Sequence, residues 1–257
     1  MSLNSQGAGI IMNILLPSLF GLHCIMGPLG VPPNISLVES LADHGKIDIW
    51  SMVPSLVDEL GETPDVLAKF ATSKFICASG GKDAICSHQI KFFQTEQTYP
   101  LGPVSPVAAS KVNDVIRVLN LTGTTEGLFI GNLVVEREDW FWFAFHPFSG
   151  FEFKEIEPGL FEHWVHRNER WSLFQGIFHT FPAENSINLK DLYIKHPSKP
   201  NLWAFNGRSD DIVVLSNGYK ISPLDTEALV STHPAVSGCL VVSILQRLRI
   251  FKARIML

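Results

Sequence analysis

Gly207-Arg-Ser-Asp-Asp-Ile-Val-Val-Leu-Ser-Asn-Gly-Tyr-Lys-Ile-Ser-Pro-Leu-Asp-Thr-Glu227 is the most informative stretch of this chain of 257 residues. An arginine and two acids open it, and the β-branched run Ile212–Leu215 predicts a short strand. Asn217-Gly218 supplies the positive φ that a tight turn needs. Asp225–Ser231 then predicts a helix, with Pro223 near its start. The stretch therefore predicts a hairpin that leads into a helix.

A hairpin and a helix need only the hydrophobic pattern, whereas this stretch also carries charged and turn residues at fixed offsets. In this combination it resembles the hinge of the adenylate-forming superfamily, which includes acyl-CoA synthetases, luciferases and peptide-synthetase adenylation domains. In that family the hinge joins a large nucleotide-binding part to a small mobile lid. The resemblance implies that Asp210, Gly218 and Lys220 are hinge residues and that Arg208 binds nucleotide.

The composition is that of a globular protein, with 46% hydrophobic and 18% charged residues. A net charge of −5 leaves no basic excess to neutralise phosphates, which argues against a nucleic-acid-binding protein. The four cysteines are scattered and form no C-x-x-C pair. Scattered thiols indicate a reducing compartment, so we expect a cytoplasmic protein.

The N-terminal segment Ala8–Met26 is almost continuously apolar, and its length approaches that of a membrane span. Asn13 and His23 interrupt it, Pro17 would kink it, and the positive region of a signal peptide does not precede it. We therefore expect a buried helix followed by a buried strand. The same order is found in the large domain of the adenylate-forming enzymes, which this segment resembles. A single long helix projecting from the body would favour the membrane alternative.

Residues 33–123 alternate between predicted helices and strands, a pattern typical of an α/β sheet. Helices are expected at Ile35–His44, from Pro54, at Pro64–Phe70 and at about Asp83–Gln94, and strands at Ile47–Val53, Lys74–Ala78 and Val115–Leu119. The second strand runs into Gly80-Gly81, where backbone can approach a flat ligand closely, although many such turns are only tight connections. In the family the matching glycines border the adenine, so the resemblance assigns Gly80 and Gly81 to the nucleotide.

The segment Asn120-Leu-Thr-Gly-Thr-Thr-Glu126 follows the third strand. A hydroxyl-rich turn closed by a carboxylate can hold a phosphate and its Mg²⁺ together. The segment resembles the family motif aromatic-Gly-x-Thr-Glu, which implies that Thr125 contacts the α-phosphate and Glu126 binds Mg²⁺. Asn120 and Thr122 would also border the nucleotide, with Thr122 in place of the usual aromatic that stacks on adenine. On the residues alone, Thr124 and Thr125 are as well explained by a turn that bonds its own backbone.

From residue 133 to 205 the sequence becomes rich in short aromatic or alternating segments divided by Gly and Pro. They are Trp140–Phe145, Phe151–Ile156 and Phe161–Val165. Such segments predict a small antiparallel sheet or distorted barrel with aromatic side chains in its core. His163 and His166 do not predict a zinc site, because a spacing of three on a strand places them on opposite faces.

Leu189-Lys-Asp-Leu-Tyr193 stands where most adenylating enzymes have Thr-Gly-Asp, whose acid bonds both ribose hydroxyls. Only the acid, Asp191, is kept. Such an acid after a strand is ordinarily a helix cap or a solvated turn, and its spacing to Arg208 is what supports a ribose role. With His196-Pro197 and Leu202-Trp203 in between, the segment looks most like the fungal adenylate-forming reductases. Those enzymes link adenylation, carrier and NADPH-reductase domains in one chain.

The resemblance covers about residues 7–242 and implies a partial large domain of an adenylate-forming enzyme, with the start of its small C-terminal lid. We expect an α/β part with a parallel sheet at 1–130, a β-rich distorted barrel at 131–206, and a hinge with a vestigial lid at 207–257. The phosphate loop and the lid lysine of the family have no counterpart here. We therefore expect a fragment of an AMP-binding adenylation domain that is inactive alone.

The reaction implied by the resemblance is ATP-dependent activation of a carboxylic acid to an acyl-adenylate, followed by thioester formation. ATP or AMP and Mg²⁺ would bind, and the full-length family adds CoA or a phosphopantetheine carrier and NADPH. The partners would be the acid substrate and a carrier domain, with no nucleic acid and no membrane. A non-catalytic remnant that binds nucleotide, or a partner protein at an exposed sheet edge, is the alternative. If the resemblance holds, Gly80, Glu126, Asp191 and Arg208 line one crevice.

Overall fold

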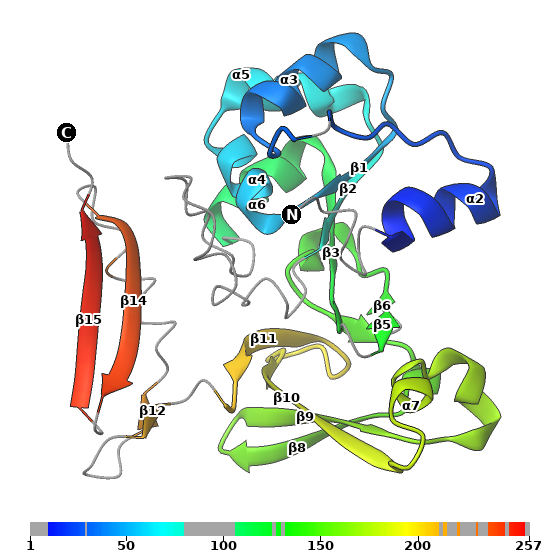
Figure 1. The fold of residues 1–257 in the computed structure, drawn as a ribbon, viewed down its shortest axis with the longest axis vertical. Helices are drawn as coiled ribbons and strands as arrows, with labels where there is room; N and C mark the ends of the chain where they lie inside the picture. Colours follow the sequence, from blue (N-terminus) through cyan, green and yellow to red (C-terminus); the bar gives the residue numbers. More distant parts are fainter. Residues whose placement is uncertain are drawn as a thin grey trace.

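The computed structural model describes residues 10–28, 30–79, 106–124, 127–129, 132–210, 213–214, 220–221, 230, 236–244 and 247–254. Its two largest sheets differ in kind (Figure 1). One has three parallel strands and is surrounded by helices, and the other has four antiparallel strands. This arrangement confirms the predicted mixed α/β fold.

The parallel sheet consists of β1 (Ile49–Met52), β2 (Phe75–Ser79) and β3 (Arg117–Leu121), in that order. Its helices are α3 (Ile35–His44), α4 (Pro54–Gly61), α5 (Pro64–Ala68), continued by the 3₁₀ turn η3 (Lys69–Thr72), and α6 (Pro106–Val115). Ser79 pairs with Leu121, so the chain leaves β2 and β3 at the same edge of the sheet. This is the edge at which the sequence predicts the nucleotide glycines and the phosphate turn.

Local sequence explains where these helices begin. The Asn34 side chain accepts a hydrogen bond from Leu37 N at 2.9 Å and caps α3, whose bounds match the prediction. Pro54 stands in the first turn of α4, as predicted, where its missing N–H leaves no bond unmade. The third strand begins two residues later than predicted, because Val115 belongs to α6. The predicted helix at 83–94 lies outside the described residues.

The core of this part is mainly apolar. Val57, Leu60, Phe70 and Ile76 are fully buried, and the rings of Trp50 and Phe70 lie 4.5 Å apart. Burial of such side chains is the main favourable contribution to folding, at roughly 1.5–3 kcal/mol for each fully buried residue. Packing of apolar side chains is therefore the main contribution to the stability of this part.

The prediction that the N-terminal apolar segment is buried is wrong. A π-helical turn, η2 (Ile11–Leu15), continues into α2 (Leu16–Phe20), and Gly21 ends the helix in the left-handed conformation at φ 63°. Ile11 is buried, but large apolar side chains along the helix are exposed, with Phe20 at 70%. Figure 1 shows α2 at the side of the helices that surround the sheet.

The predicted strand after this helix is also absent, since residues 22–28 have no regular structure. An extended segment needs a neighbouring strand to satisfy its backbone groups. Within the described part of the chain, β1 pairs only with β2 and offers no partner to residues 22–28. In the same described residues, no helix has both the length and the apolar character to cross a membrane.

The antiparallel sheet consists of β8 (Phe151–Glu157), β9 (Leu160–His166), β10 (Ser186–Lys195) and β11 (Trp203–Arg208). Its strand order is β11-β10-β9-β8, which confirms the predicted small antiparallel sheet. His163 is fully buried among aromatic rings, whereas the His166 side chain is half exposed and bonds Glu152. The two histidines thus lie on opposite faces, as predicted.

Short elements accompany this sheet. They are β4 (Gly123–Thr124), β5 (Leu128–Phe129), β6 (Asn132–Leu133), η6 (Arg137–Asp139), β7 (Ala144–Phe145), η7 (Pro147–Ser149), η8 (Glu169–Phe174) and α7 (Ile177–Thr180). The predicted strand at 140–145 is wrong in its first half. Trp142 N donates to Asp139 O at 2.8 Å, which makes 140–142 a turn that extends η6.

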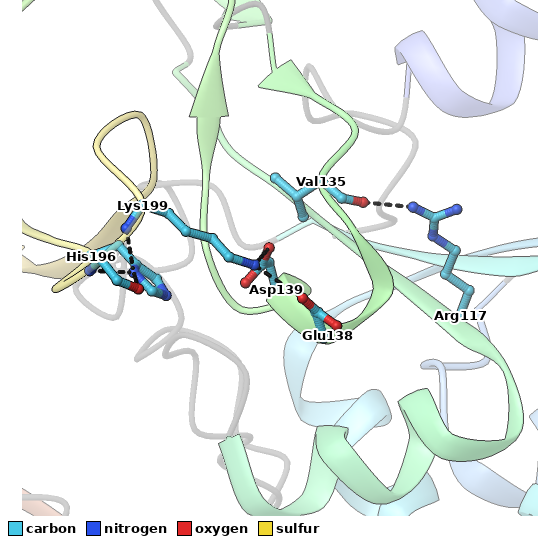
Figure 2. Close-up of polar contacts among 7 residues, drawn as sticks. Arg117, Val135, Glu138, Asp139, His196 and Lys199 are labelled. Carbon is cyan, nitrogen blue, oxygen red and sulfur yellow. Dashed lines mark hydrogen bonds and ion pairs between the residues drawn. The ribbon is translucent and has the colours of Figure 1, made fainter.

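The segment 135–139 connects the two sheets (Figure 2). Lys199, between β10 and β11, reaches Asp139 at 2.5 Å and Glu138 at 3.1 Å. The hydrogen bonds to Asp139 and Glu138 raise the pKa of Lys199. On the other side, Arg117 of β3 donates to Val135 O at 2.6 Å. The end of the antiparallel sheet is thereby fixed against the parallel one.

Two hairpins follow. β12 (Val213–Val214) pairs with β13 (Lys220–Ile221), which confirms the hairpin predicted from the opening stretch. β14 (Val236–Ile244) pairs with β15 (Arg247–Arg254), and Figure 1 shows this second hairpin at one side of the body. The predicted helix at 225–231 lies almost wholly outside the described residues. The division into domains at 130/131 and 206/207 stays a prediction.

Candidate functional site

Asp191 and Arg208, two of the predicted nucleotide residues, lie opposite each other on β10 and β11. Arg208 Nη1 is 3.5 Å from Asp191 Oδ1. Asp191 is only 1% exposed, and the Arg208 side chain is 21% exposed. A buried carboxylate is costly without a nearby cation, and the guanidinium supplies one. The pair therefore places opposite charges beside each other on the paired strands β10 and β11.

Asp191 is aimed inward by a bulge in β10. Its neighbour Lys190 has a φ of 61°, and the register with β9 shifts between Asn188 and Leu192. Two hydrogen bonds fix this bulge: Lys190 N donates to Asn188 Oδ1 at 2.6 Å, and Ser209 N donates to Lys190 O at 2.7 Å. A bulge breaks the alternation of a strand and re-aims a side chain. Asp191, Leu192 and Tyr193 are accordingly buried in succession.

The strand β11 has a matching irregularity. Gly207, next to Arg208, has a φ of 95°, a conformation that glycine adopts without steric cost. The partners of Asp191 and Tyr193 are Arg208 and Phe205, which are three positions apart, whereas Asp191 and Tyr193 are two positions apart. Both strands therefore deviate at the charged pair and regain regular pairing beyond it.

Tyr193 links this pair to the turn after β3. Burial raises the pKa of its phenol, the Asp191 carboxylate acts in the same direction, and the Thr122 side chain acts against them. The Thr122 side chain therefore lies beside the Tyr193 hydroxyl. Thr122, from the turn after β3, and Asp191, from β10, thus both act on one buried tyrosine.

The predicted hinge residue Asp210 also contacts Arg208. Arg208 Nε donates to Asp210 Oδ1 at 2.7 Å, and Nη2 donates to Oδ2 at 2.6 Å. The hydrogen bond from Arg208 lowers the pKa of the Asp210 carboxyl, and it outweighs the opposite effect of burial. Arg208 thus stands between a buried acid of the sheet and the first acid of the hinge.

Other predicted residues have structural contacts. Asn120 lies opposite Ala78 on β2, and its side chain donates to Phe141 O at 3.3 Å. Thr124 Oγ1 accepts a hydrogen bond from Gly127 N at 2.8 Å, so Thr124 bonds the backbone of its own turn. A small hollow of about 30 Å³ lies beside this turn, bordered by Thr124, Gly127 and Gln175.

The remaining predicted residues cannot be placed. Gly80, Gly81, Thr125, Glu126 and Gly218 lie outside the described residues, and Lys220 is described only as the start of β13. Among the residues that are described, no group of three His, Cys, Asp or Glu side chains could hold a metal ion. The predicted crevice that joins these residues to Asp191 therefore stays a prediction.

Two side chains at this site were not singled out from the sequence. Tyr193 is two positions after Asp191 on β10 and is fully buried. Glu162 of β9 accepts a hydrogen bond from Trp164 Nε1 at 3.1 Å and lies opposite Leu192 of β10. No sequence motif distinguishes Glu162, whose position depends on strand register. Lys190 stands where the family motif Thr-Gly-Asp has glycine, and that glycine could have predicted the positive φ at this position.

The chain is similar in sequence to known proteins. Residues 210–247 match the family described as the AMP-binding enzyme C-terminal domain. An isocyanide synthase–NRPS hybrid of Aspergillus fumigatus is 65% identical over 92% of this chain, and a carboxylic acid reductase of Neurospora crassa is 25% identical over 84%. The chain spans 13% and 19% of the lengths of these two relatives.

Solved structures agree on the fold. O-succinylbenzoate coenzyme A synthetase of Bacillus subtilis, determined in complex with AMP, superposes with a TM-score of 0.62 at 16% sequence identity. The match covers 96% of this chain and 48% of that enzyme. Because the matched C-terminal family, the fungal relatives and the fold all agree, the chain belongs to the adenylate-forming superfamily.

Proposed function

We propose that this chain forms the ribose-binding and hinge-bearing part of an adenylation domain. The observation that carries the proposal is the Asp191–Arg208 pair on bulged strands, 3.5 Å apart and next to the hinge residue Asp210. A carboxylate accepts hydrogen bonds from both hydroxyls of a ribose, and a guanidinium donates to a nucleotide oxygen. The pair supplies both kinds of contact at one place.

The reaction that such a domain serves is activation of a carboxylic acid by ATP. The acid oxygen attacks the α-phosphorus, pyrophosphate leaves, and the acyl-adenylate then forms a thioester with CoA or a phosphopantetheine carrier. Positioning and neutralisation of charge dominate the catalysis of such transfers. Asp191 and Arg208 would orient the nucleotide, while Thr125 would contact its α-phosphate and Glu126 would bind Mg²⁺.

Nucleotide binding by this chain should be weak. The Asp191 carboxylate is buried, and Arg208 is already engaged by Asp210 through two short hydrogen bonds. A ribose that reaches Asp191 must therefore compete with an existing contact and open a buried site. Such reorganisation reduces the observed affinity.

A comparison of AMP with 2′,3′-dideoxy-AMP tests the proposal. Hydrogen bonds to charged groups contribute about 1.5–3 kcal/mol, so loss of both ribose hydroxyls should weaken binding by roughly 10-fold or more. Asp191→Asn should abolish this preference for AMP, because an amide accepts fewer hydrogen bonds than a carboxylate. Arg170→Ala, at an exposed arginine that stacks on Trp171, is the control and should retain the preference. Equal affinity of the native chain for the two nucleotides would remove the ribose assignment.

Catalysis gives a second prediction. The 257 residues alone should show no carboxylate-dependent exchange of pyrophosphate into ATP, since their sequence contains no phosphate loop or lid lysine. Loss of one group that stabilises transition-state charge typically costs about 10²-fold or more in rate. Exchange above background with any carboxylic acid would contradict this expectation, with a complete acyl-CoA synthetase as the positive control.

The second candidate function is a non-catalytic role in binding a partner protein. The exposed apolar side chains of α2, including Leu19 and Phe20, favour it, because surface patches of this kind mark interaction sites. Leu19→Glu with Phe20→Glu should then abolish association of the chain with its partner and leave AMP binding unchanged. If AMP binding is absent altogether, the partner-binding function becomes the better supported one.

A further inference from the structure

We infer that Gly176, at the start of α7, is a positioning residue for the turn at 124–127, where the proposed function places the contacts with the α-phosphate and Mg²⁺. The inference rests on that proposed function, because it concerns the same nucleotide site. Its basis is a close approach of two backbone segments. A Cβ atom on Gly176 would lie 3.0 Å from Gly127 O, and one on Gly127 would lie 3.0 Å from Ile177 Cβ. The turn therefore rests directly on the backbone of α7.

Backbone conformation does not require glycine at position 176. Gly176 has a φ of −52° and a ψ of −30°, in the right-handed helical region that every residue adopts readily. At such a position alanine ordinarily stabilises a protein relative to glycine, because it lowers the conformational entropy of the unfolded chain. Space is therefore the reason that glycine suits this position, and a larger residue must displace either α7 or the turn.

The residue before Gly176 anchors α7 to the end of the antiparallel sheet, where Figure 1 shows this helix. The Gln175 side chain is 3% exposed and donates to His166 O at 2.7 Å and to Ser149 O at 3.3 Å. Its Oε1 accepts a hydrogen bond from Asn168 N at 2.8 Å. Buried polar groups with their partners in place hold a segment firmly. Gln175 thus fixes the backbone that Gly176 continues.

The residues after Gly176 add an apolar attachment. Ile177 and Phe178 are buried and belong to one cluster with Val165 and Leu189 of the sheet. Dense packing of this kind resists displacement.

The turn has room to shift. It is closed by a hydrogen bond of its own, from Gly127 N to Thr124 Oγ1 at 2.8 Å, and both residues border the hollow of about 30 Å³. Because α7 is anchored on both sides of Gly176, a methyl group added there should move the turn rather than α7.

Nucleotide binding separates positioning of the phosphate from general stability. The affinity ratio of AMP to adenosine reports the phosphate contact, and the ratio of AMP to 2′,3′-dideoxy-AMP reports the ribose contact. Gly176→Ala should lower the first ratio by roughly 10-fold, equivalent to one hydrogen bond to a charged group, and leave the second unchanged. Gly27→Ala is the matched control, since its Cβ would meet Leu37 Cδ2 at an ordinary 3.5 Å, and it should leave both ratios unchanged.

Two binding results would overturn the inference. One is an unchanged AMP-to-adenosine ratio in Gly176→Ala, and the other is an equal fall in both ratios, which would show a merely structural role. A native chain that prefers AMP to dideoxy-AMP but not to adenosine would overturn it as well, with the ribose assignment intact.

Hydrogen exchange tests the same contact without a ligand. In Gly176→Ala the Gly127 amide should exchange faster, because its bond to Thr124 Oγ1 is displaced, while amides of β10 and β11 should keep their rates. An unchanged Gly127 rate overturns the inference even if AMP binds as proposed, and so does an equal acceleration in β10 and β11. Faster exchange at Gly127 alone, in a chain that does not prefer AMP to dideoxy-AMP, means that the positioning contact exists and the proposed function has failed.

Discussion

The parallel and antiparallel sheets differ in how they carry their predicted site residues. In the parallel sheet the strands pair in regular register, and the predicted residue Asn120 lies within β3 with Thr122 directly after it. In the antiparallel sheet, Asp191 and Arg208 lie within paired strands, at positions where the pairing is irregular. A regular strand orients its side chains by alternation alone, whereas a bulge breaks the alternation and re-aims a side chain.

The interiors differ in the same way. The core of the parallel part is mainly apolar, with Ser55 and Asn113 among its few buried polar side chains, whereas the antiparallel part buries Asp191, His163 and Tyr193 almost completely. Buried polar groups stabilise a fold only when their partners are in place. The stability of the antiparallel sheet therefore depends on specific polar contacts, and that of the parallel sheet depends mainly on how well its apolar side chains fill the core.

The largest expected effect is on the apolar core. Phe70→Ala removes a fully buried ring that packs against Trp50, and it should lower the free energy of unfolding by about 3–5 kcal/mol. Urea denaturation followed by tryptophan fluorescence measures this change. Leu173→Ala is the control, because that side chain is 82% exposed and its loss should change stability by less than about 0.5 kcal/mol. Similar losses in the two variants would contradict the view that packing holds the parallel sheet.

The sequence predicts the regular parts of this fold well. Capping by Asn34 and the proline in the first turn of α4 are local signals, and both helices begin at the predicted residues. The aromatic alternation predicts β8 and β9 for the same reason, since period two is a property of a single strand. Such local signals predict a helix or strand from its own residues, whatever elements pack against it.

The failures have non-local causes. The apolar run at 8–26 predicts burial, but burial needs a partner surface, and apolar pattern alone does not provide one. The site is predictable only in part for a similar reason. Asp191 and Arg208 are identified by a motif, whereas Glu162 is defined by register with β10, and no single-strand pattern specifies register of this kind.

A medium effect is expected at the bulge. Lys190 adopts a φ of 61°, which costs a side-chain-bearing residue roughly 1–2 kcal/mol, and glycine avoids this steric cost. Lys190→Gly should therefore be more stable than Lys190→Ala by about 1 kcal/mol, despite the greater entropy of glycine in the unfolded chain. Both variants lose the long Lys190–Asp210 ion pair of 3.8 Å, so the comparison isolates the backbone. Equal midpoints in urea would mean that the bulge is not strained.

The smallest expected effect concerns the link between this sheet and the hinge. The bidentate contact from Arg208 lowers the pKa of Asp210, so the folded chain holds this carboxyl charged at a pH where the unfolded chain protonates it. A depressed folded pKa gives stability that is fully present above the unfolded pKa, roughly 4, and that is lost as the pH falls through the folded pKa.

Arg208→Lys keeps a positive charge near Asp191 but cannot form the two parallel hydrogen bonds to Asp210. It should therefore move the titration midpoint of Asp210 upward. The carbon-13 shift of the Asp210 carboxyl measures the midpoint, with Arg170→Ala as a control that should leave it in place. Because the Asp210 side chain is 39% exposed, solvent screens the contact and the effect on overall stability should be small. An Asp210 midpoint that is the same in Arg208→Lys and in the native chain would show that Arg208 does not couple the antiparallel sheet to the hinge.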